Sequence, residues 1–193
     1  LLKWRIIRGP ARYLANSRYA YSIISRTDRV RTNRLRDRIK RSEMPQHVSI
    51  IMDGNRRFAW SQELGREVGH QHGKEKLKEV MDWILDLKIP YLTVYALSTE
   101  NMTGREDDEL DTLYDLYVTG FQEICSDPKI HSSGVKVQAV GRLELLPERV
   151  QNAIKVAEEK TGEYTNFLFT VCLAYGGREE IVDAVRELAD DHA

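Results

Sequence analysis

The chain has 193 residues, of which 41% are hydrophobic and 31% charged, which suits one sizeable globular domain with an appendage. Its net charge of −1 conceals a split: residues 1–41 contain 13 Lys or Arg and two acidic residues, a formal charge of +11, and the remainder carries −12. Two cysteines, Cys125 and Cys172, exclude a disulfide framework and favour a reducing cytosol. No apolar run reaches the roughly 18 residues that span a bilayer.

After a basic, partly helical arm (1–43), the domain that follows (44–193) alternates between apolar strands and amphipathic helices. The predicted elements are strand 47–52, helix 73–87, strand 91–97, helix 107–125, strand 135–140, helix 147–160, strand 167–175 and helix 178–189. This order predicts an α/β fold with a mostly parallel central sheet flanked by helices. Strands this apolar are expected to be covered on both faces. The last helix is expected to turn four apolar residues inward: Ile181, Val182, Val185 and Leu188.

Polar turns follow all four predicted strands, beginning at Asp53, Ser98, Gly141 and Gly176. Ligands of such sheets bind beyond the carboxyl ends of the strands, so these turns form one candidate rim. Guanidinium groups form bidentate hydrogen bonds with phosphate oxygens, and glycine lets backbone N–H groups approach an anion. A lone carboxylate can hold Mg²⁺ when substrate phosphates supply further ligands. The rim therefore predicts a diphosphate site, and the nucleoside triphosphate and dinucleotide motifs are absent from the sequence.

Four sequence blocks carry a resemblance to a known family: HVSIIMDGNRRFAW, GREVGHQHGKEKL, LTVYALSTEN and NFLFTVCLAYGGREEIVDAV. In order and spacing they resemble the cis-prenyltransferases, the undecaprenyl and dehydrodolichyl diphosphate synthases, and most of all the archaeal branch. The resemblance covers about residues 45–192. It implies Mg²⁺-dependent condensation of isopentenyl diphosphate onto an allylic prenyl diphosphate, giving a long (Z)-polyprenyl diphosphate. It also implies an apolar tunnel and a homodimer.

The resemblance implies roles for individual residues as well. Asp53 matches the family's metal-linked catalytic aspartate, and Asn55 and Ser98 match polar groups near the reacting carbons. The implied substrate-binding residues are Gly54, Arg56, Arg57, Phe58, Arg66, His70, Glu100, Asn101, Arg105, Gly177 and Arg178. Taken alone, Asp53 before a glycine is equally a turn-former, and Glu100 could serve only to orient its loop.

The sequence departs from the family pattern in two places. After the S-x-E-N motif the family has an aromatic residue and then an arginine, whereas Met102 and Gly104 stand here, with Arg105 one residue later. The family also continues with a strand, an R-x-x-x-R-x-S stretch that binds isopentenyl diphosphate, and a metal-holding glutamate, all of which this chain is expected to lack. Two hypotheses stay open: an active synthase, which the complete diphosphate cradle favours, and a non-catalytic partner or prenyl-lipid-binding subunit.

The basic arm is expected to serve the membrane surface. Anionic headgroups attract clustered Lys and Arg, and five apolar or aromatic residues could insert shallowly: Trp4, Ile6, Ile7, Tyr13 and Leu14. The alternative is that the arm packs on the acidic body of its own or a partner subunit. No nucleic-acid recognition motif is present. The expected location is the cytoplasm, peripheral at the inner face of the membrane.

Overall fold

The structure, a computed structural model, describes residues 32–190. The chain divides into two compact units, Leu1–Met44 and Pro45–Ala193. In the described part of the first unit, residues 32–40 are helical. The side chains predicted to insert into a membrane lie outside the described residues. Within the described ranges, no helix is both long and apolar enough to cross a bilayer.

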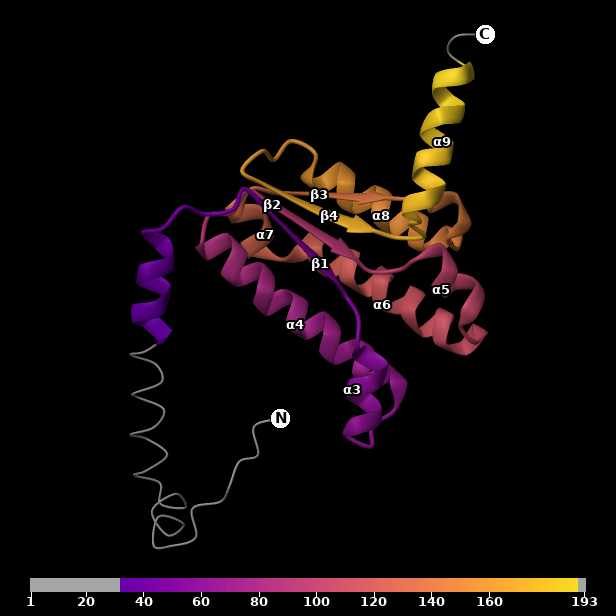
Figure 1. Ribbon diagram of the computed structural model, residues 1–193, viewed down its shortest axis with the longest axis horizontal. Helices are drawn as coiled ribbons and strands as arrows, with labels where there is room; N and C mark the ends of the chain where they lie inside the picture. Colours follow the sequence, from indigo (N-terminus) through magenta and orange to yellow (C-terminus); the bar gives the residue numbers. More distant parts are fainter. Residues whose placement is uncertain (1–31, 191–193) are drawn as a thin grey trace, which may run out of the picture. The chain divides into compact units, whose positions relative to one another are not determined.

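The second unit is built on a four-stranded parallel sheet (Figure 1). Its strands are β1 His47–Ile51, β2 Tyr91–Tyr95, β3 Val135–Val140 and β4 Phe167–Cys172, in the spatial order β1-β2-β4-β3. Ile50 lies opposite Val94, and Val94 lies opposite Val171, so neighbouring strands end together at one edge. The predicted parallel α/β sheet is confirmed, and its carboxyl edge collects the polar turns.

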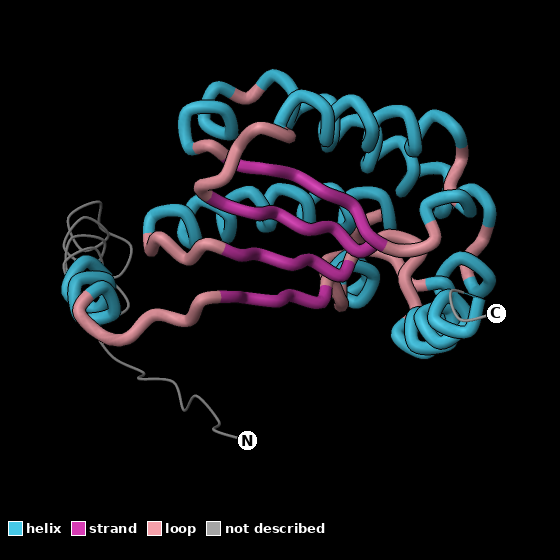
Figure 2. The backbone as a smooth tube through the Cα atoms, turned by 90° about the horizontal axis from the view of Figure 1, so that it is seen from above, coloured by secondary structure: helices cyan, strands magenta, loops and turns pink. Residues whose placement is uncertain are grey.

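Seven helices of this unit connect or follow the strands in the described residues (Figure 2). They are α3 Asn55–Ser61, α4 Arg66–Asp86, α5 Thr99–Gly104, α6 Asp107–Ser126, α7 Pro128–Ser133, α8 Glu148–Thr161 and α9 Gly177–Asp190, with a 3₁₀ turn at Leu143–Leu145. The sequence predicted the four long helices but missed α3, α5 and α7. Each of these has six or seven residues, too few for a helical period to show.

One face of the sheet is the core, and the other is more open. Leu92, Val94 and Val137 are completely or almost completely buried. The prediction that all strands are covered on both faces is wrong for β1, where His47 and Ile51 are exposed. The reason is that β1 is an edge strand whose residues alternate between the core and the open face, as in a half-buried strand.

The prediction for the last helix is also wrong in one respect. α9 forms, but it projects away from the sheet (Figure 1), and its apolar residues 181, 182, 185 and 188 are 46–67% exposed. Contacts are concentrated near its first turns, where Arg142 donates hydrogen bonds to Asp183 at 2.6 and 3.0 Å. An amphipathic pattern predicts a helix, but it does not supply the surface that covers the apolar stripe.

Candidate active site

The turn after β1 presents a carboxylate and a guanidinium at the carboxyl edge. The Asp53 carboxylate accepts hydrogen bonds from the backbone N–H of Gly54 at 2.6 Å and from Arg57 Nη2 at 3.0 Å. Gly54 has φ +94°, a left-handed conformation that favours glycine. The side chains of Asp53 and Arg57 are 77% and 79% exposed. Both groups are therefore open to a ligand.

Two glycines of α4 allow it to lie directly against α3. A Cβ atom at Gly69 would come within 2.4 Å of the Asn55 carbonyl oxygen, and one at Gly73 within 2.7 Å of the Asn55 side-chain amide. Gly69 and Gly73 are both buried. The close approach holds Asn55 beside α4 and brings His70, which follows Gly69, close to the turn that carries Asp53.

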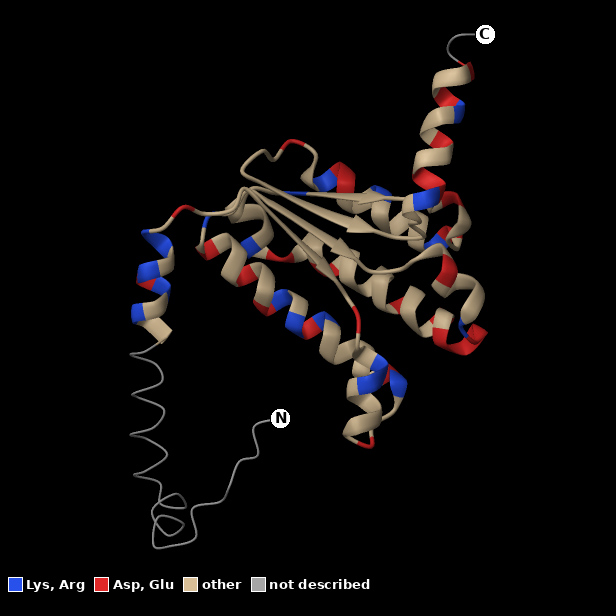
Figure 3. Ribbon diagram, in the orientation of Figure 1, with Lys and Arg blue, Asp and Glu red and all other residues tan. Residues whose placement is uncertain are grey.

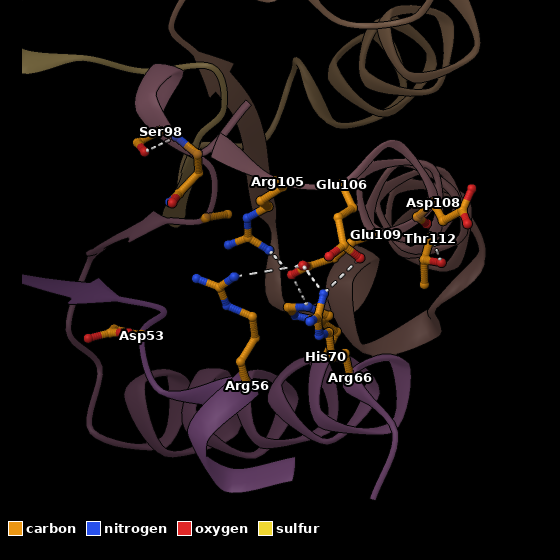
Figure 4. Close-up of polar contacts among 12 residues, drawn as sticks. Asp53, Arg56, Arg66, His70, Ser98, Arg105, Glu106, Asp108, Glu109 and Thr112 are labelled. Atoms are coloured by element: carbon orange, nitrogen blue, oxygen red, sulfur yellow. Dashed lines mark hydrogen bonds and ion pairs between the residues drawn. The ribbon is translucent and has the colours of Figure 1, made fainter. Parts of the chain in front are cut away.

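A buried carboxylate organises the positive groups beside this turn (Figure 4). Glu109, at the start of α6, has a side chain that is only 5% exposed. Its Oε1 atom accepts a hydrogen bond from Arg105 Nη1 at 2.7 Å and lies 3.1 Å from His70 Nε2. Its Oε2 atom lies 3.5 Å from Arg66 Nη1 and 3.8 Å from Arg56 Nη1. Residues from α3, α4 and α6 thus meet at one carboxylate.

This cluster keeps a surplus of positive charge. Its three guanidinium groups face two carboxylates among the described residues, because Glu106 adds an ion pair with Arg66 at 3.1 Å. Arg105 Nε and Glu109 Oε2 are buried without a hydrogen-bond partner. A buried donor without a partner is unfavourable, so Arg105 offers an N–H group to an anion that binds here.

The protonation states in the cluster follow from burial and neighbouring charges. Burial lowers the pKa of His70, and the guanidinium groups of Arg105 and Arg56 reinforce this against the opposing effect of Glu109. Burial raises the pKa of Glu109, but the hydrogen bond with His70 and the adjacent guanidiniums outweigh it and hold that pKa below its usual value. At neutral pH, His70 is therefore a neutral imidazole whose Nε2–H donates to an ionised Glu109.

The turns after β2 and β4 are joined to each other. Ser98 is buried, and its hydroxyl accepts the backbone N–H of Asn101 at 2.9 Å, which caps α5. Ser98 also forms a parallel bridge with Tyr175, whose carbonyl accepts the Tyr95 hydroxyl at 2.8 Å. Ser98 is thus positioned as a helix cap, and backbone pairing holds the two turns together.

An apolar cavity of about 640 Å³ extends from this edge between the sheet and the helices α4 and α6. Val94, Phe169 and Val171 line it from the sheet. The predicted site residues in its lining are Asp53, Gly54, Asn55, Arg56, Arg57, His70, Asn101 and Arg105. The predicted residues outside that lining are Phe58, Arg66, Ser98, Glu100, Gly177 and Arg178. The structure therefore brings together the turn after β1, the start of α4 and the α5–α6 region.

Sequence analysis missed Glu109, although the sequence contained a signal for it. Glu109 precedes Leu113 by four residues, so on the predicted helix it shares a face with this apolar residue. A carboxylate on the apolar face of a predicted helix is uncommon unless it is paired. The position of Glu109 on an apolar face was therefore the signal that it has a charged partner.

The donor set fits Mg²⁺ only together with a phosphate-bearing ligand. Within the described part of the chain, no three His, Cys, Asp or Glu side chains are grouped to hold a metal ion. In the turn after β1, Asp53 presents an exposed carboxylate that also lines the cavity. Mg²⁺ is commonly held by one or two carboxylates, water and substrate phosphates, which is compatible with this single protein ligand.

The fold, the positive rim and the apolar cavity define a class of protein suited to a long apolar molecule with an anionic head. A family model described as "Putative undecaprenyl diphosphate synthase" matches residues 51–193. The chain belongs to this family, the cis-prenyltransferases, whose members transfer prenyl groups and generally use Mg²⁺. The predicted family is confirmed.

Archaeal proteins are among the similar relatives. A protein of Methanopyrus kandleri is 52% identical over 159 residues, covering 81% of this chain and 58% of the relative. A protein of Pyrococcus horikoshii is 46% identical over 155 residues, covering 80% and 58%. Both are named tritrans,polycis-undecaprenyl-diphosphate synthase (geranylgeranyl-diphosphate specific). This chain thus spans less than two thirds of the length of these relatives.

Solved structures agree with the fold. Lavandulyl diphosphate synthase from Lavandula x intermedia, in complex with dimethylallyl diphosphate, has a TM-score of 0.69 and 34% identity, covering 76% of this chain and 61% of that one. A probable undecaprenyl diphosphate synthase from Campylobacter jejuni has a TM-score of 0.63 and 24% identity, covering 78% and 64%. The second likeness concerns the fold alone.

Proposed function

We propose that this protein is a cis-prenyltransferase that condenses isopentenyl diphosphate onto an allylic prenyl diphosphate and releases diphosphate, giving a longer (Z)-polyprenyl diphosphate. The observation that carries the proposal is the surplus of guanidinium groups around Glu109 at the mouth of an apolar cavity. The names of the two archaeal relatives support geranylgeranyl diphosphate as the allylic substrate.

The allylic substrate would bind with its diphosphate at the rim and its prenyl tail in the cavity. Arg56, Arg57 and Arg105 all line the cavity mouth and would donate charge-assisted hydrogen bonds to the phosphate oxygens. Arg105 Nε, which has no partner, would gain one. Glu109 holds Arg56, Arg105 and the neutral His70 in place, and Asp53 holds Arg57, so little reorganisation is needed on binding.

In the reaction, the allylic C–O bond breaks and its electron pair stays on the departing diphosphate. The double bond of isopentenyl diphosphate supplies the electrons of the new C–C bond, and the resulting cation loses a proton to the released diphosphate. The guanidinium groups stabilise the negative charge that grows on the diphosphate. Mg²⁺, held by Asp53 and the phosphates, would add a further positive charge there when bound.

The direct test is turnover combined with binding. The full-length protein is incubated with radiolabelled isopentenyl diphosphate, geranylgeranyl diphosphate and Mg²⁺, and binding of the allylic substrate is titrated separately. We expect Asp53→Asn to lower turnover by roughly 10²–10³-fold, as when an electrostatic stabiliser is removed. Arg57→Ala should weaken binding by about tenfold or more through the loss of a hydrogen bond to a charged group.

A matched control is the ion pair between Arg149 and Asp111 (2.9 Å), which lies on α8 and α6 outside the cavity lining. Asp111→Asn should leave both the turnover and the affinity for the allylic substrate unchanged. Binding without turnover under every condition would instead identify a prenyl-lipid-binding subunit. If Arg57→Ala binds the allylic substrate as tightly as the unaltered protein, the diphosphate binds elsewhere.

A further inference from the structure

The ion pair between Asp53 and Arg57 lies where the carboxylate of Asp53 would meet a divalent cation. Asp53 lies between β1 and α3, and Arg57 follows it by four residues in the first turn of α3. Figure 3 shows this change of sign, with an acidic position after β1 and basic positions on α3. Both residues line the cavity, and both side chains are more than three-quarters exposed. The ion pair is therefore accessible to a ligand.

The two oxygen atoms of the Asp53 carboxylate are held in different ways. Oδ1 accepts the backbone N–H of Gly54 at 2.6 Å, whereas Oδ2 accepts Arg57 Nη2 at 3.0 Å. The first contact belongs to the turn itself and keeps the carboxylate oriented. The second comes from a long, exposed side chain, and an exposed ion pair of this kind contributes little to stability. Oδ2 is therefore the atom that can exchange its partner.

Arg57 has different surroundings from Arg56, the neighbouring guanidinium of α3. Arg56 is directed toward the buried Glu109, at 3.8 Å, and away from Asp53 (Figure 4). Within the described residues, the carboxylate that pairs with Arg57 is Asp53. Arg57 Nη2 also lies 3.8 Å from the position that a Cβ atom on Gly54 would take, so the guanidinium is folded back over the turn. The position of Arg57 therefore depends on Asp53.

A divalent cation and Arg57 compete for the same carboxylate oxygen. Mg²⁺ binds oxygen ligands at about 2.1 Å, so a cation on Oδ2 would lie about 4–5 Å from the guanidinium nitrogen that now donates to this atom. In water, two unit charges about 4 Å apart already change a binding constant by about fivefold, and this cation carries two charges. A diphosphate removes the conflict, because its oxygens attract the guanidinium and also bind the cation.

We propose that Arg57 is a latch on Asp53. Without substrate, Arg57 occupies Oδ2 and opposes the binding of a divalent cation. When the diphosphate of the allylic substrate binds, Arg57 transfers to its oxygens and releases Oδ2 to the cation. The cation and the diphosphate therefore bind cooperatively, and a site without substrate holds little metal. The proposal rests on the proposed function, since it takes an allylic diphosphate as the ligand that receives Arg57.

The test measures cation binding and diphosphate binding separately on the full-length protein. Mn²⁺, which takes the same oxygen ligands as Mg²⁺, is titrated without substrate, and its free concentration is read from its electron paramagnetic resonance signal. Geranylgeranyl diphosphate is titrated in the presence of chelator. We expect Arg57→Ala to bind Mn²⁺ about fivefold or more tightly than the unaltered protein, and geranylgeranyl diphosphate about tenfold or more weakly. The two affinities thus change in opposite directions.

Two control variants separate the latch from a general effect of charge. Arg56→Ala also removes a guanidinium of the rim, but Arg56 faces Glu109, so its affinity for Mn²⁺ should change by less than about twofold. Asp53→Asn/Arg57→Ala should lose the gain in Mn²⁺ affinity, because the carboxylate that binds the cation is gone. Arg57→Gln removes the charge but keeps a long polar side chain. It should show the same gain as Arg57→Ala and replaces that variant if the alanine variant does not fold.

Each result either supports the latch or overturns it. Equal Mn²⁺ affinity in the unaltered protein and in Arg57→Ala overturns it, and so does an absence of detectable Mn²⁺ binding in both. A gain of the same size in Arg56→Ala overturns it as well, because the cause is then the net charge of the rim. Failure of the unaltered protein to bind geranylgeranyl diphosphate, with or without Mn²⁺, overturns the proposed function instead.

Discussion

Glu109 shows how one buried residue can organise a site without being exposed to the ligand. Its carboxylate holds Arg105 at 2.7 Å and His70 at 3.1 Å, and these contacts keep a guanidinium and a neutral imidazole beside the cavity mouth. A positive cluster without such a carboxylate would repel itself. The same arrangement makes the stability of the protein sensitive to acid.

We expect the free energy of unfolding to fall in two stages on acidification. The pKa of His70 in the folded protein lies below its ordinary value of 6.5, so its contribution is complete above that pH and is lost as the pH falls further. The pKa of Glu109 lies below its ordinary value of 4.5, so its contribution is present above that pH and is lost at lower pH. Urea unfolding between about pH 8 and pH 3 measures both stages.

Variants assign the two stages to their residues. His70→Gln should abolish the first stage and leave the second. Glu109→Gln should reduce stability at neutral pH by about 1–3 kcal/mol, because hydrogen bonds to charged partners are lost, and should flatten the second stage. If His70→Gln loses stability between pH 7 and 5 as steeply as the unaltered protein, the neutral imidazole is not the cause.

At the scale of elements, the contact between α3 and α4 decides where the site residues lie. Gly69 and Gly73 leave no room for a side chain beside Asn55. The sequence predicted a start for this helix at position 73, whereas α4 begins at Arg66. The two glycines resemble helix breakers, but here they allow two helices to touch.

We expect Gly69→Ala to destabilise the protein by about 1–3 kcal/mol, as overpacking does. The added methyl would lie 2.4 Å from the Asn55 carbonyl oxygen and 2.8 Å from the Ala59 Cβ atom. It should also weaken prenyl diphosphate binding, because the turn that carries Asp53 must shift. Thermal unfolding and ligand titration measure the two effects.

The matched control is Gly120→Ala in α6, where nothing lies within 4 Å of the added Cβ. This change should stabilise the protein by up to about 1 kcal/mol, because alanine favours a helix interior. Equal stability effects at the two positions would show that the close contact between α3 and α4 is not what constrains Gly69.

At the scale of the whole molecule, the formal charge of +11 on residues 1–41 stands against −12 on the rest. We propose that this arm brings the enzyme to anionic membrane, where a long prenyl product must be delivered, and that the enzyme is a homodimer in the cytoplasm. Each basic residue near an anionic surface contributes about 1 kcal/mol to binding.

We expect deletion of residues 1–41 to abolish co-sedimentation with phosphatidylglycerol vesicles. Turnover with a detergent-solubilised allylic substrate should stay within a few-fold, because the candidate site lies entirely within residues 45–193. Vesicles of phosphatidylcholine, which carry no net charge, are the control and should bind neither form. Loss of turnover, or dissociation of an oligomer, would show instead that the arm is structural.

The sequence by itself determined the order of strands and helices, the parallel sheet and the polar rim at the carboxyl ends of the strands. These follow from local patterns: apolar runs, helical periods such as that of α6, and turns rich in glycine and charge. Short helices such as α3 were not predicted, because one or two helical turns contain too few residues for a helical periodicity to be recognised. The family resemblance added residue roles that these local patterns do not contain.

Only the tertiary structure decided which side chains are buried and which meet. Lys74 and Glu123 are 49 positions apart, and His70 and Glu109 are 39 apart, so their contacts depend on how α4 lies against α6. Whether the open face of β1 and the apolar stripe of α9 are buried likewise depends on what packs against them. The periodicity of apolar residues along an element indicates which side chains share a face. Burial of that face requires another element packed against it, and that element comes from elsewhere in the chain.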